Sequence, residues 1–221
     1  MRAVILSSGG KDSAAALWWT QCRGWSVTHL ATVRISGTDS MMFQMPGTDL
    51  VEHQAKLTGI QWLAIESEGI VEQEVEDLEV RLAELEFDAL VCGALRSDYQ
   101  KSRIERMCER LGVHSFTPLW HQNAYAHLAG MVEHGFEIMI TGVSAEGLGK
   151  EWLGHIITRN SLLTLKELSQ RYRFNVDGEG GEYESIVIAG PHHHGRLVLE
   201  HQQVWDGVRG HLVITRCSTE P

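Results

Sequence analysis

The chain has 221 residues, of which 43% are hydrophobic and 22% charged, as in an ordinary soluble globular protein of one large domain or two small ones. Its formal net charge of −10 argues against broad binding to nucleic acid, although a local basic patch could still hold one RNA. No apolar run is long enough for a transmembrane helix or a signal peptide, so we expect a cytoplasmic protein without a membrane partner.

Strand and helix patterns alternate across the first half of the chain. Short apolar runs predict strands at residues 3–6, 27–33, 61–65 and 87–92. Helical patterns are predicted at residues 14–21, 48–58, 71–85 and 102–111. The first helix starts at Asp12 or Ser13, and the second and fourth helices end at Gly59 and Gly112. This alternation predicts an α/β fold with an open, mostly parallel sheet.

The pattern changes near residue 120, where we place a domain boundary between residues 1–120 and 121–221. A helix at 124–133 and a strand at 136–142 come first, followed by a glycine-rich stretch at 144–154, a helix at 162–173 and strands at 185–189, 196–204 and 211–215. Because no Pro/Ser-rich linker separates the halves, we expect them to pack tightly, and ligand sites favour such junctions.

The four cysteines are far apart in the sequence and form no CxxC pair: Cys22, Cys92, Cys108 and Cys217. In a cytoplasmic chain such residues are most simply small buried hydrophobes with free thiols. We therefore expect no zinc or iron–sulfur site built on cysteine.

The segment Ser-Ser-Gly-Gly-Lys-Asp-Ser, residues 7–13, joins the first predicted strand to the first helix. In an open α/β sheet this turn aims backbone N–H groups and the helix N-terminus at a bound anion. Gly9 and Gly10 leave the backbone accessible, and Lys11 adds a positive charge. The segment matches neither GxxxxGK[ST] nor GxGxxG, because Asp12 follows the lysine and the two glycines are adjacent. It predicts an anion site in preference to a simple Gly-rich turn before a capped helix.

A second polar segment, residues 93–106, follows the fourth predicted strand and should face the same crevice as the first loop. Lys101, Arg103 and Arg106 supply cationic donors that suit phosphate or carboxylate groups. A solvated helix start with local ion pairs, such as Lys101 with Glu105, explains the same residues equally well.

Two further segments are informative only in combination. Residues 177–184 contain three glycines with Glu179, Glu182 and Glu184, and clustered carboxylates are favoured beside a metal, an ammonium group or a substrate amine. On its own, an exposed acidic loop is the better explanation. The glycine-rich stretch at 144–154 could cover a pocket or be an ordinary connection.

The sequence SGGKDS after a first strand resembles the signature of the PP-loop ATP pyrophosphatases, which have a Rossmann-like, HUP-type sheet. Together, SGGKDS, GALRSDYQKSRIE, VSAEGLGKEWLG and GEGGEYES resemble the diphthine–ammonia ligase family, also known as the ATP-binding diphthamide-synthesis domain family. The resemblance runs from residue 3 to about residue 190. It implies a nucleotide-binding PP-loop domain at 1–120 and a smaller α+β substrate-binding domain at 121–221.

The resemblance implies ATP-dependent amide formation. A substrate carboxylate attacks the α-phosphate of ATP to give an acyl-adenylate and pyrophosphate, and ammonia then displaces AMP. The family's substrate is diphthine, a modified histidine of a translation elongation factor that carries a trimethylammonium group. The implied small molecules are ATP, Mg²⁺ and free ammonium.

The implied site residues fall into groups. The catalytic residues are Lys11, Asp12 and Glu182, and Asp12 is also the metal ligand. ATP is bound by Ser7, Ser8, Gly9, Gly10, Lys11, Ser13, Gly93, Gln100 and Arg103. The carboxylic-acid substrate is bound by Tyr99, Glu146, Trp152, Glu179, Gly180, Gly181, Glu182, Tyr183 and Glu184, whose acidic and aromatic side chains suit a cation.

Two segments depart from the family pattern. The loop Ser-Met-Met-Phe-Gln-Met-Pro, residues 40–46, lacks the Tyr and His of the family's loop, so a bacterial-type relative that amidates another small acid stays open. Three consecutive histidines at 192–194 cannot easily all face one tetrahedral zinc ion, and we expect a surface loop there.

Other classes also stay open. A PP-loop enzyme that modifies tRNA would want a basic face and, for thiolation, reactive cysteines, both of which the composition disfavours. A non-catalytic nucleotide-binding protein would have little need for Lys11 together with Asp12. The sequence also leaves open whether the chain forms a homodimer.

Overall fold

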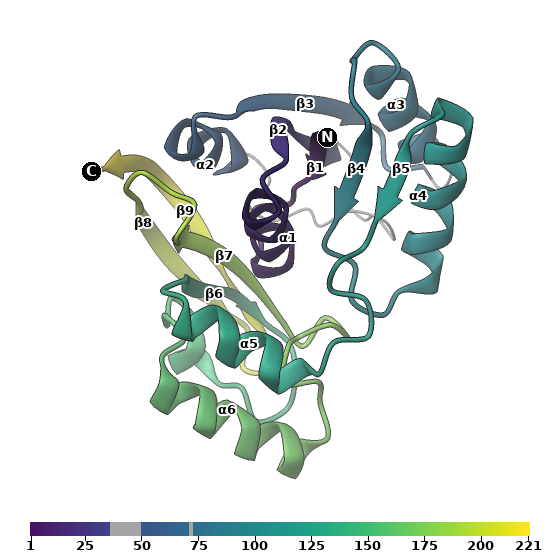
Figure 1. Cartoon of the computed structure of the whole chain (residues 1–221). Helices are drawn as coiled ribbons and strands as arrows, with labels where there is room; N and C mark the ends of the chain where they lie inside the picture. Colours follow the sequence, from purple (N-terminus) through teal and green to yellow (C-terminus); the bar gives the residue numbers. More distant parts are fainter. Residues whose placement is uncertain (36–49, 71–72) are drawn as a thin grey trace. The chain divides into compact units, whose positions relative to one another are not determined.

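The computed structural model describes residues 1–35, 50–70 and 73–221, so the predicted loop at 40–46, with Met41, Met42 and Phe43, lies outside the described residues. These residues form two compact units, Met1–Trp120 and His121–Pro221, and each is described by itself (Figure 1). In the part of the chain that the structure describes, no helix has both the length and the apolar character to cross a membrane.

The first unit is a parallel sheet with helices in the connections. Its elements are β1 (Arg2–Leu6), α1 (Lys11–Cys22), β2 (Ser26–Ile35), α2 (Val51–Thr58), β3 (Gln61–Ser67), α3 (Gln73–Leu82), β4 (Ala89–Cys92), α4 (Asp98–Leu111) and β5 (His114–Phe116). The strands are all parallel, in the order β3-β2-β1-β4-β5. The predicted α/β class is confirmed, and the strand order reverses direction between β1 and β4, where such sheets bind ligands.

Alternating side chains of β1 fill the two cores of this sheet. Ala3 and Ile5 belong to a cluster with residues of α1 and α2, whereas Val4 belongs to a cluster with residues of α3 and α4. Apolar residues on both faces are what a doubly covered parallel sheet requires. Figure 1 shows the two helix pairs on either side of the sheet.

Several predicted boundaries were wrong. Helix α1 begins at Lys11 with Gly10 as its N-cap, because the Ser13 hydroxyl bonds back to the Gly10 carbonyl instead of capping the helix itself. Helix α3 ends at Leu82, where the chain tightens into a turn, and helix α4 begins at Asp98 because the Ser97 side chain accepts a bond from an amide of its first turn. The three-residue strand β5 carried too short a pattern to be predicted.

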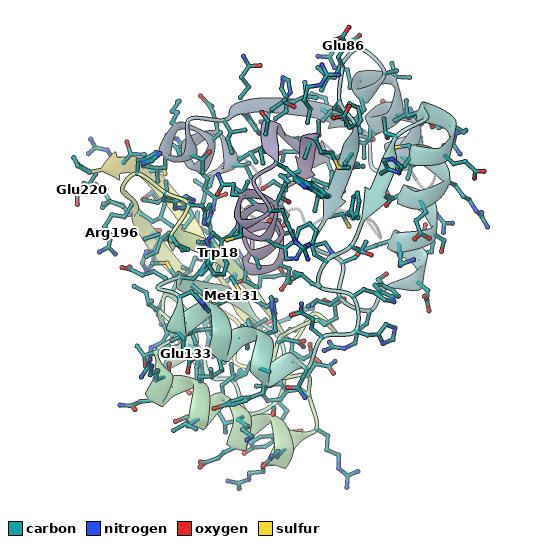
Figure 2. All side chains as sticks on the ribbon, viewed as in Figure 1. Trp18, Glu86, Met131, Glu133, Arg196 and Glu220 are labelled. Carbon is teal, nitrogen blue, oxygen red and sulfur yellow. The ribbon has the colours of Figure 1, made fainter. Side chains whose placement is uncertain are left out.

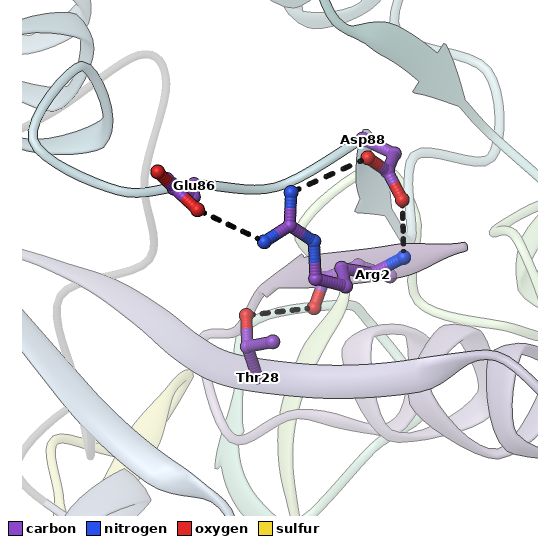
Figure 3. Close-up of polar contacts among 5 residues, drawn as sticks. Arg2, Thr28, Glu86 and Asp88 are labelled. Carbon is purple, nitrogen blue, oxygen red and sulfur yellow. Dashed lines mark hydrogen bonds and ion pairs between the residues drawn. The ribbon is translucent and has the colours of Figure 1, made fainter.

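The amino ends of the strands are tied together by polar contacts (Figure 3). The backbone N–H of Arg2 donates to Asp88 at 2.6 Å, and its guanidinium donates to Glu86 at 3.2 Å. The Thr28 hydroxyl donates to the carbonyl of Ala3 at 3.3 Å. These contacts lie at the end of the sheet opposite to the first loop.

The second unit is a smaller α+β arrangement, as predicted. Its elements are α5 (Ala124–Glu133), β6 (Glu137–Val143), the 3₁₀ turn η2 (Lys150–Trp152), α6 (Arg159–Tyr172), β7 (Tyr183–Ala189), β8 (Arg196–Trp205) and β9 (Gly210–Glu220). The antiparallel sheet has the order β7-β6-β9-β8. Helix α5 is amphipathic: Met131 is buried and Glu133, two residues on, is exposed (Figure 2).

The turn between β7 and β8 contains one buried and one exposed histidine. His192 is 7% exposed, its ring lies 5.3 Å from that of Phe136 and 4.2 Å from that of His193, and only His194 is exposed. Burial lowers the pKa of His192 to about 3 and that of His193 to about 4. The predicted surface loop is thus present, but His192 is buried in it, beside Phe136 and His193.

The cysteines are free, and Cys92 and Cys108 are buried. Burial raises the pKa of the Cys108 thiol to about 12, so it stays protonated and packs as a small hydrophobe. The prediction of buried cysteines with free thiols is confirmed for these two residues, but it was wrong for Cys22, which is exposed, and for Cys217, which is partly exposed.

Candidate functional site

The first loop, residues 7–10, leaves β1 at its carboxyl end and enters α1 directly. Gly10 is the N-cap and makes no side-chain capping bond, and the first helical hydrogen bond runs from Ala14 N to Gly10 O at 3.1 Å. The amides of Lys11, Asp12 and Ser13 therefore precede the first intrahelical donor and point out of the helix N-terminus. Together with the helix dipole they form an anion-binding end at the point where the strand order reverses.

Neighbouring elements hold the first loop in shape. Gly9 has a left-handed backbone with φ of 81°, a conformation that favours glycine. The side chain of Gln54, on α2, donates to the Gly9 carbonyl at 3.0 Å, and the N–H of Ser7 donates to Ala31 on β2 at 2.8 Å. The loop is thus fixed by two other elements before any ligand binds.

Gly93, directly after β4, contacts the same first turn of α1. A Cβ at this position would lie 2.5 Å from the backbone carbon and oxygen of Asp12 and 2.8 Å from the nitrogen of Ser13. The structure thus brings Gly93 to the first loop, as the shared crevice requires. This close approach of two backbones explains why residue 93 is a glycine.

Lys11 and Asp12 form a largely buried ion pair. The Lys11 ammonium lies 2.8 Å from an Asp12 carboxylate oxygen, and their side chains are 6% and 23% exposed. Burial strengthens the electrostatic interaction of both charges with a ligand, since less water screens them. Lys11 can thus supply charge to a phosphate, while Asp12 orients the lysine.

Two cationic side chains near the start of α4 contact residues of their own helix. Lys101 pairs with Glu105, as the structural alternative predicted. Arg103 instead stacks its guanidinium 3.5 Å over the ring of Tyr99 and donates to the Tyr99 carbonyl at 3.4 Å. Gln100, one residue on from Tyr99, is partly exposed.

In the second unit, two predicted motifs form one structure. The loop after β6 begins at Ser144, whose N–H donates to the Glu182 carbonyl at 2.9 Å and whose hydroxyl donates to the Gly181 carbonyl. The motif at 144–154 and the acidic motif at 177–184 are thus neighbours. In the sequence, the two motifs are connected only as parts of the same family pattern.

The Glu182 carboxylate is bound within its own loop. One oxygen accepts from the Asn175 backbone at 2.8 Å and from the Asn175 side chain at 2.9 Å, and the other accepts from Gly180 N at 2.7 Å. Both oxygens therefore already have donors, and Glu182 is a weaker candidate for contact with a substrate cation than the sequence suggested.

Two aromatic residues of the predicted substrate site are in the core. Tyr183 is 3% exposed, begins β7 and donates its hydroxyl to the Val176 carbonyl at 2.9 Å. Trp152 is 7% exposed and packs edge-on against His155 at 5.3 Å. Both rings pack within their own unit, and their assignment to the substrate site stays a prediction.

The carboxylates that remain accessible are Glu146, Glu179 and Glu184. Glu146 is exposed, and the other two are partly exposed. Glu184 lies beside Gly142 of β6, where a Cβ would sit 3.4 Å from the glutamate side chain. Apart from Glu182, these are the acidic residues of the predicted substrate site.

The described residues were compared with the ligand sets that metal ions require. Among residues 1–35, 50–70 and 73–221, no group of three or more His, Cys, Asp and Glu side chains could hold an ion. Mg²⁺ is commonly held by one or two carboxylates together with substrate phosphates and water. Asp12, at the mouth of the first loop, suits that mode.

Sequence reasoning missed three residues that shape these loops: Gln54, Ser144 and Asn175. Gln54 lies 45 positions from Gly9, so no local pattern links the two. Asn175 precedes the acidic motif by two residues, and only its proximity to that motif could have drawn attention to it.

Comparison with known proteins assigns the chain to a family. Its residues 1–115 match the diphthamide synthase N-terminal domain, and residues 123–219 match the diphthamide synthase C-terminal domain. The chain belongs to the diphthamide synthase family. The predicted resemblance is thus confirmed, and it covers both units.

Relatives of this family are named as ligases. Diphthine–ammonia ligase of Danio rerio is 32% identical over 90% of this chain and 87% of that protein. The human protein of the same name is 29% identical over 92% of this chain and 85% of that protein. The Schizosaccharomyces pombe protein is 29% identical over 96% of this chain, which spans 38% of that longer protein.

Proposed function

We propose that the chain is an ATP-dependent ligase that converts a carboxylate into an amide. The carboxylate displaces pyrophosphate from the α-phosphate of ATP to give an acyl-adenylate, and ammonia then displaces AMP and loses a proton. The observation that carries the proposal is the first loop, in which an uncapped helix N-terminus and the buried ammonium of Lys11 lie at the reversal of strand order. Relatives named diphthine–ammonia ligase support this chemistry.

The first loop would bind the departing pyrophosphate. The amides of Lys11 to Ser13 and the hydroxyls of Ser7 and Ser8 are donors for phosphate oxygens, and the Lys11 ammonium offsets the charge that develops there. Gln54 and Gly93 keep these donors in place, so little reorganisation is needed when ATP binds. Mg²⁺, held by Asp12 and the phosphates, would further neutralise the leaving group.

The second unit would bind the acid to be amidated. Glu146, Glu179 and Glu184 offer negative charge near a substrate cation, such as the trimethylammonium group of diphthine. We propose diphthine on a translation elongation factor as the acceptor and the cytoplasm as the location. The alternative acceptor is another small carboxylic acid. The departure of residues 40–46 from the family's loop pattern favours this alternative.

The test is pyrophosphate release from ATP, measured with and without ammonium and with each candidate acceptor. We expect AMP and pyrophosphate in equal amounts at steady state, and continued turnover that needs both ammonium and the diphthine-bearing elongation factor. ADP and phosphate as products would contradict the adenylation. Turnover with tRNA, or with a small acid in place of the protein, would assign a different acceptor.

Replacement of Lys11 tests the role of the first loop. We expect Lys11→Met to lower kcat/KM for ATP by about 100-fold, the effect of removing one donor from a developing oxyanion. Lys56→Met is the matched control, because Lys56 is exposed on α2 and pairs with Glu52 of the same helix. If both variants behaved alike, the loop would not be the pyrophosphate site.

A further inference from the structure

The loop 175–182 is closed by a single carboxylate. Glu182 accepts hydrogen bonds from both ends of the loop, from Asn175 at its start and from Gly180 near its end. The amides of Gly178 and Gly181 are also committed, because they donate to the carbonyls of Asn175 and Gly178 at 2.9 and 3.0 Å. The backbone of this loop therefore has its shape before any substrate arrives.

The same contact explains why residue 180 is a glycine. Its backbone does not need a left-handed conformation, yet a Cβ there would lie 2.7 Å from a Glu182 carboxylate oxygen and 3.0 Å from the Asn175 amide nitrogen. A side chain at this position would push the carboxylate out of the loop. The sequence feature and the hydrogen bonds thus point to one arrangement, which we call the Asn175–Glu182 clamp.

The clamp also connects to the other loop of the second unit. The carbonyl of Glu182 accepts from Ser144 N at 2.9 Å and from Ala145 N at 3.2 Å. The segment that carries Glu146 is therefore hydrogen-bonded at its start to the backbone of Glu182. On the far side, Glu182 is followed by strand β7, which carries Glu184. The clamp thus lies where the loop that carries Glu179, the segment that carries Glu146 and the strand that carries Glu184 meet.

We propose that Glu182 and Asn175 are positioning residues: their clamp fixes the backbone that presents Glu146, Glu179 and Glu184 to the acid substrate. This inference rests on the proposed function for the reaction it serves, but the clamp itself is a property of the protein without substrate. It differs from a direct role of Glu182 in binding a cation, which would need its charge and neither Asn175 nor Gly180.

Three substitutions separate these roles. Asn175→Ala keeps every charge and removes one donor, Gly180→Ala keeps every charge and inserts the clashing Cβ, and Glu182→Gln removes the charge and sets an amide N–H₂ against one of the loop donors. For a positioning role we expect each to lower kcat/KM for the acid substrate by about 10-fold or more, since misplacement of binding groups by about 1 Å is enough for a large loss. The KM for ATP should not change.

The combination of substitutions gives a sharper result. If Asn175 and Glu182 act through one clamp, the double variant Asn175→Ala/Glu182→Gln should be no worse than the more damaged single variant. Additive losses would mean independent roles and would overturn the proposal. So would a loss confined to Glu182→Gln, which would restore the direct charge role. Glu167→Gln on α6, an exposed glutamate of the same unit, is the control for loss of one charge.

Amide hydrogen exchange tests the clamp without turnover. In the wild-type chain we expect the amides of Asn175 and Gly180 to exchange slowly, and at least 10-fold faster in Glu182→Ala, while those of β6 stay unchanged. Faster exchange throughout the unit would show general loosening and would contradict a local positioning role. Protection at both amides in a chain that releases no pyrophosphate would overturn the proposed function and keep the clamp. Rapid exchange of both amides in an active wild-type enzyme would overturn the clamp alone.

Discussion

The two motif loops of this protein reach a fixed shape by opposite means. The first loop is buried and is held by other elements: Gln54 bonds to Gly9, and Gly93 packs on the backbone of Asp12. The loop 175–182 lies nearer the surface and is held by its own side chains, Asn175 and Glu182. Contacts with other elements thus hold the first loop, whereas the clamp binds amide donors of its own loop.

This difference follows from what each loop is proposed to bind. A polyphosphate needs bare N–H groups, and these are available only if something other than the loop's own carboxylates fixes the backbone. A cationic or amine-bearing substrate needs acceptors, so a carboxylate of the loop can bind the loop amides without loss of binding groups for the substrate. The four predictions below test this contrast, in order of decreasing effect.

The largest effect is expected from a side chain at Gly93. Gly93→Ala places a Cβ 2.5 Å from backbone atoms of Asp12, which cannot give way as a flexible side chain would. We expect a loss of about 3 kcal/mol in the free energy of unfolding and no measurable ATP binding, by urea denaturation and calorimetry. Gly130→Ala is the control, since its Cβ meets nothing within 4 Å on α5, and it should be neutral or stabilising. Equal behaviour of the two variants would show that the close approach at Gly93 is not essential.

Acid should weaken the second unit through its buried histidines. The pKa of His192 falls from 6.5 to about 3, and that of His193 to about 4, because burial disfavours the charged ring. The unfolded chain therefore takes up protons below about pH 6.5 that the folded chain refuses, and stability present above that pH declines as the pH falls toward 4. We expect a loss on the order of 2 kcal/mol between pH 7 and pH 4 from His192.

The measurement is urea denaturation followed at several pH values in wild type and in His192→Leu. The variant should lose less stability than wild type over this pH range. Parallel pH dependence in the two proteins would show that His192 is charged or solvated in the folded state.

A smaller effect is expected at Gln54. Gln54→Ala removes the hydrogen bond to the Gly9 carbonyl and leaves that buried oxygen without this donor, which should cost about 1 kcal/mol. ATP affinity should fall a few-fold because the loop loses one of its supports. Gln73→Ala, exposed at the start of α3, is the control. Unchanged ATP affinity in calorimetry would mean that the loop keeps its shape without Gln54.

The smallest effect is expected at the opposite end of the sheet. Arg2→Ala removes exposed ion pairs to Glu86 and Asp88, while the backbone bond to Asp88 remains (Figure 3). Exposed pairs contribute little because water and salt screen them. We expect an unchanged KM for ATP and a denaturation midpoint close to that of wild type. A clear change in KM would link the amino ends of the strands to the first loop.

Most of the elements could be predicted because their patterns are local. The apolar run of β1 is itself the strand signal. Helix α5 lies between Asn123 and Gly135, and its bounds were predicted to the residue. The errors arose where a tertiary contact or a cap decides. Ser97 starts α4 four residues before its charged pattern, and β5 exists only because β4 offers it a partner.

The sequence by itself determined the α/β class, the order of the motifs and the family, because these depend on residue type, spacing and local periodicity. Only the tertiary structure decided which motif residues are accessible. It buries Trp152, Tyr183 and His192, which the sequence alone assigned to the surface or to the substrate site. It also assigns Gln54 and Asn175 to loops they support, since hydrogen-bond partners that are distant in sequence or set by a turn's geometry leave no pattern in the chain.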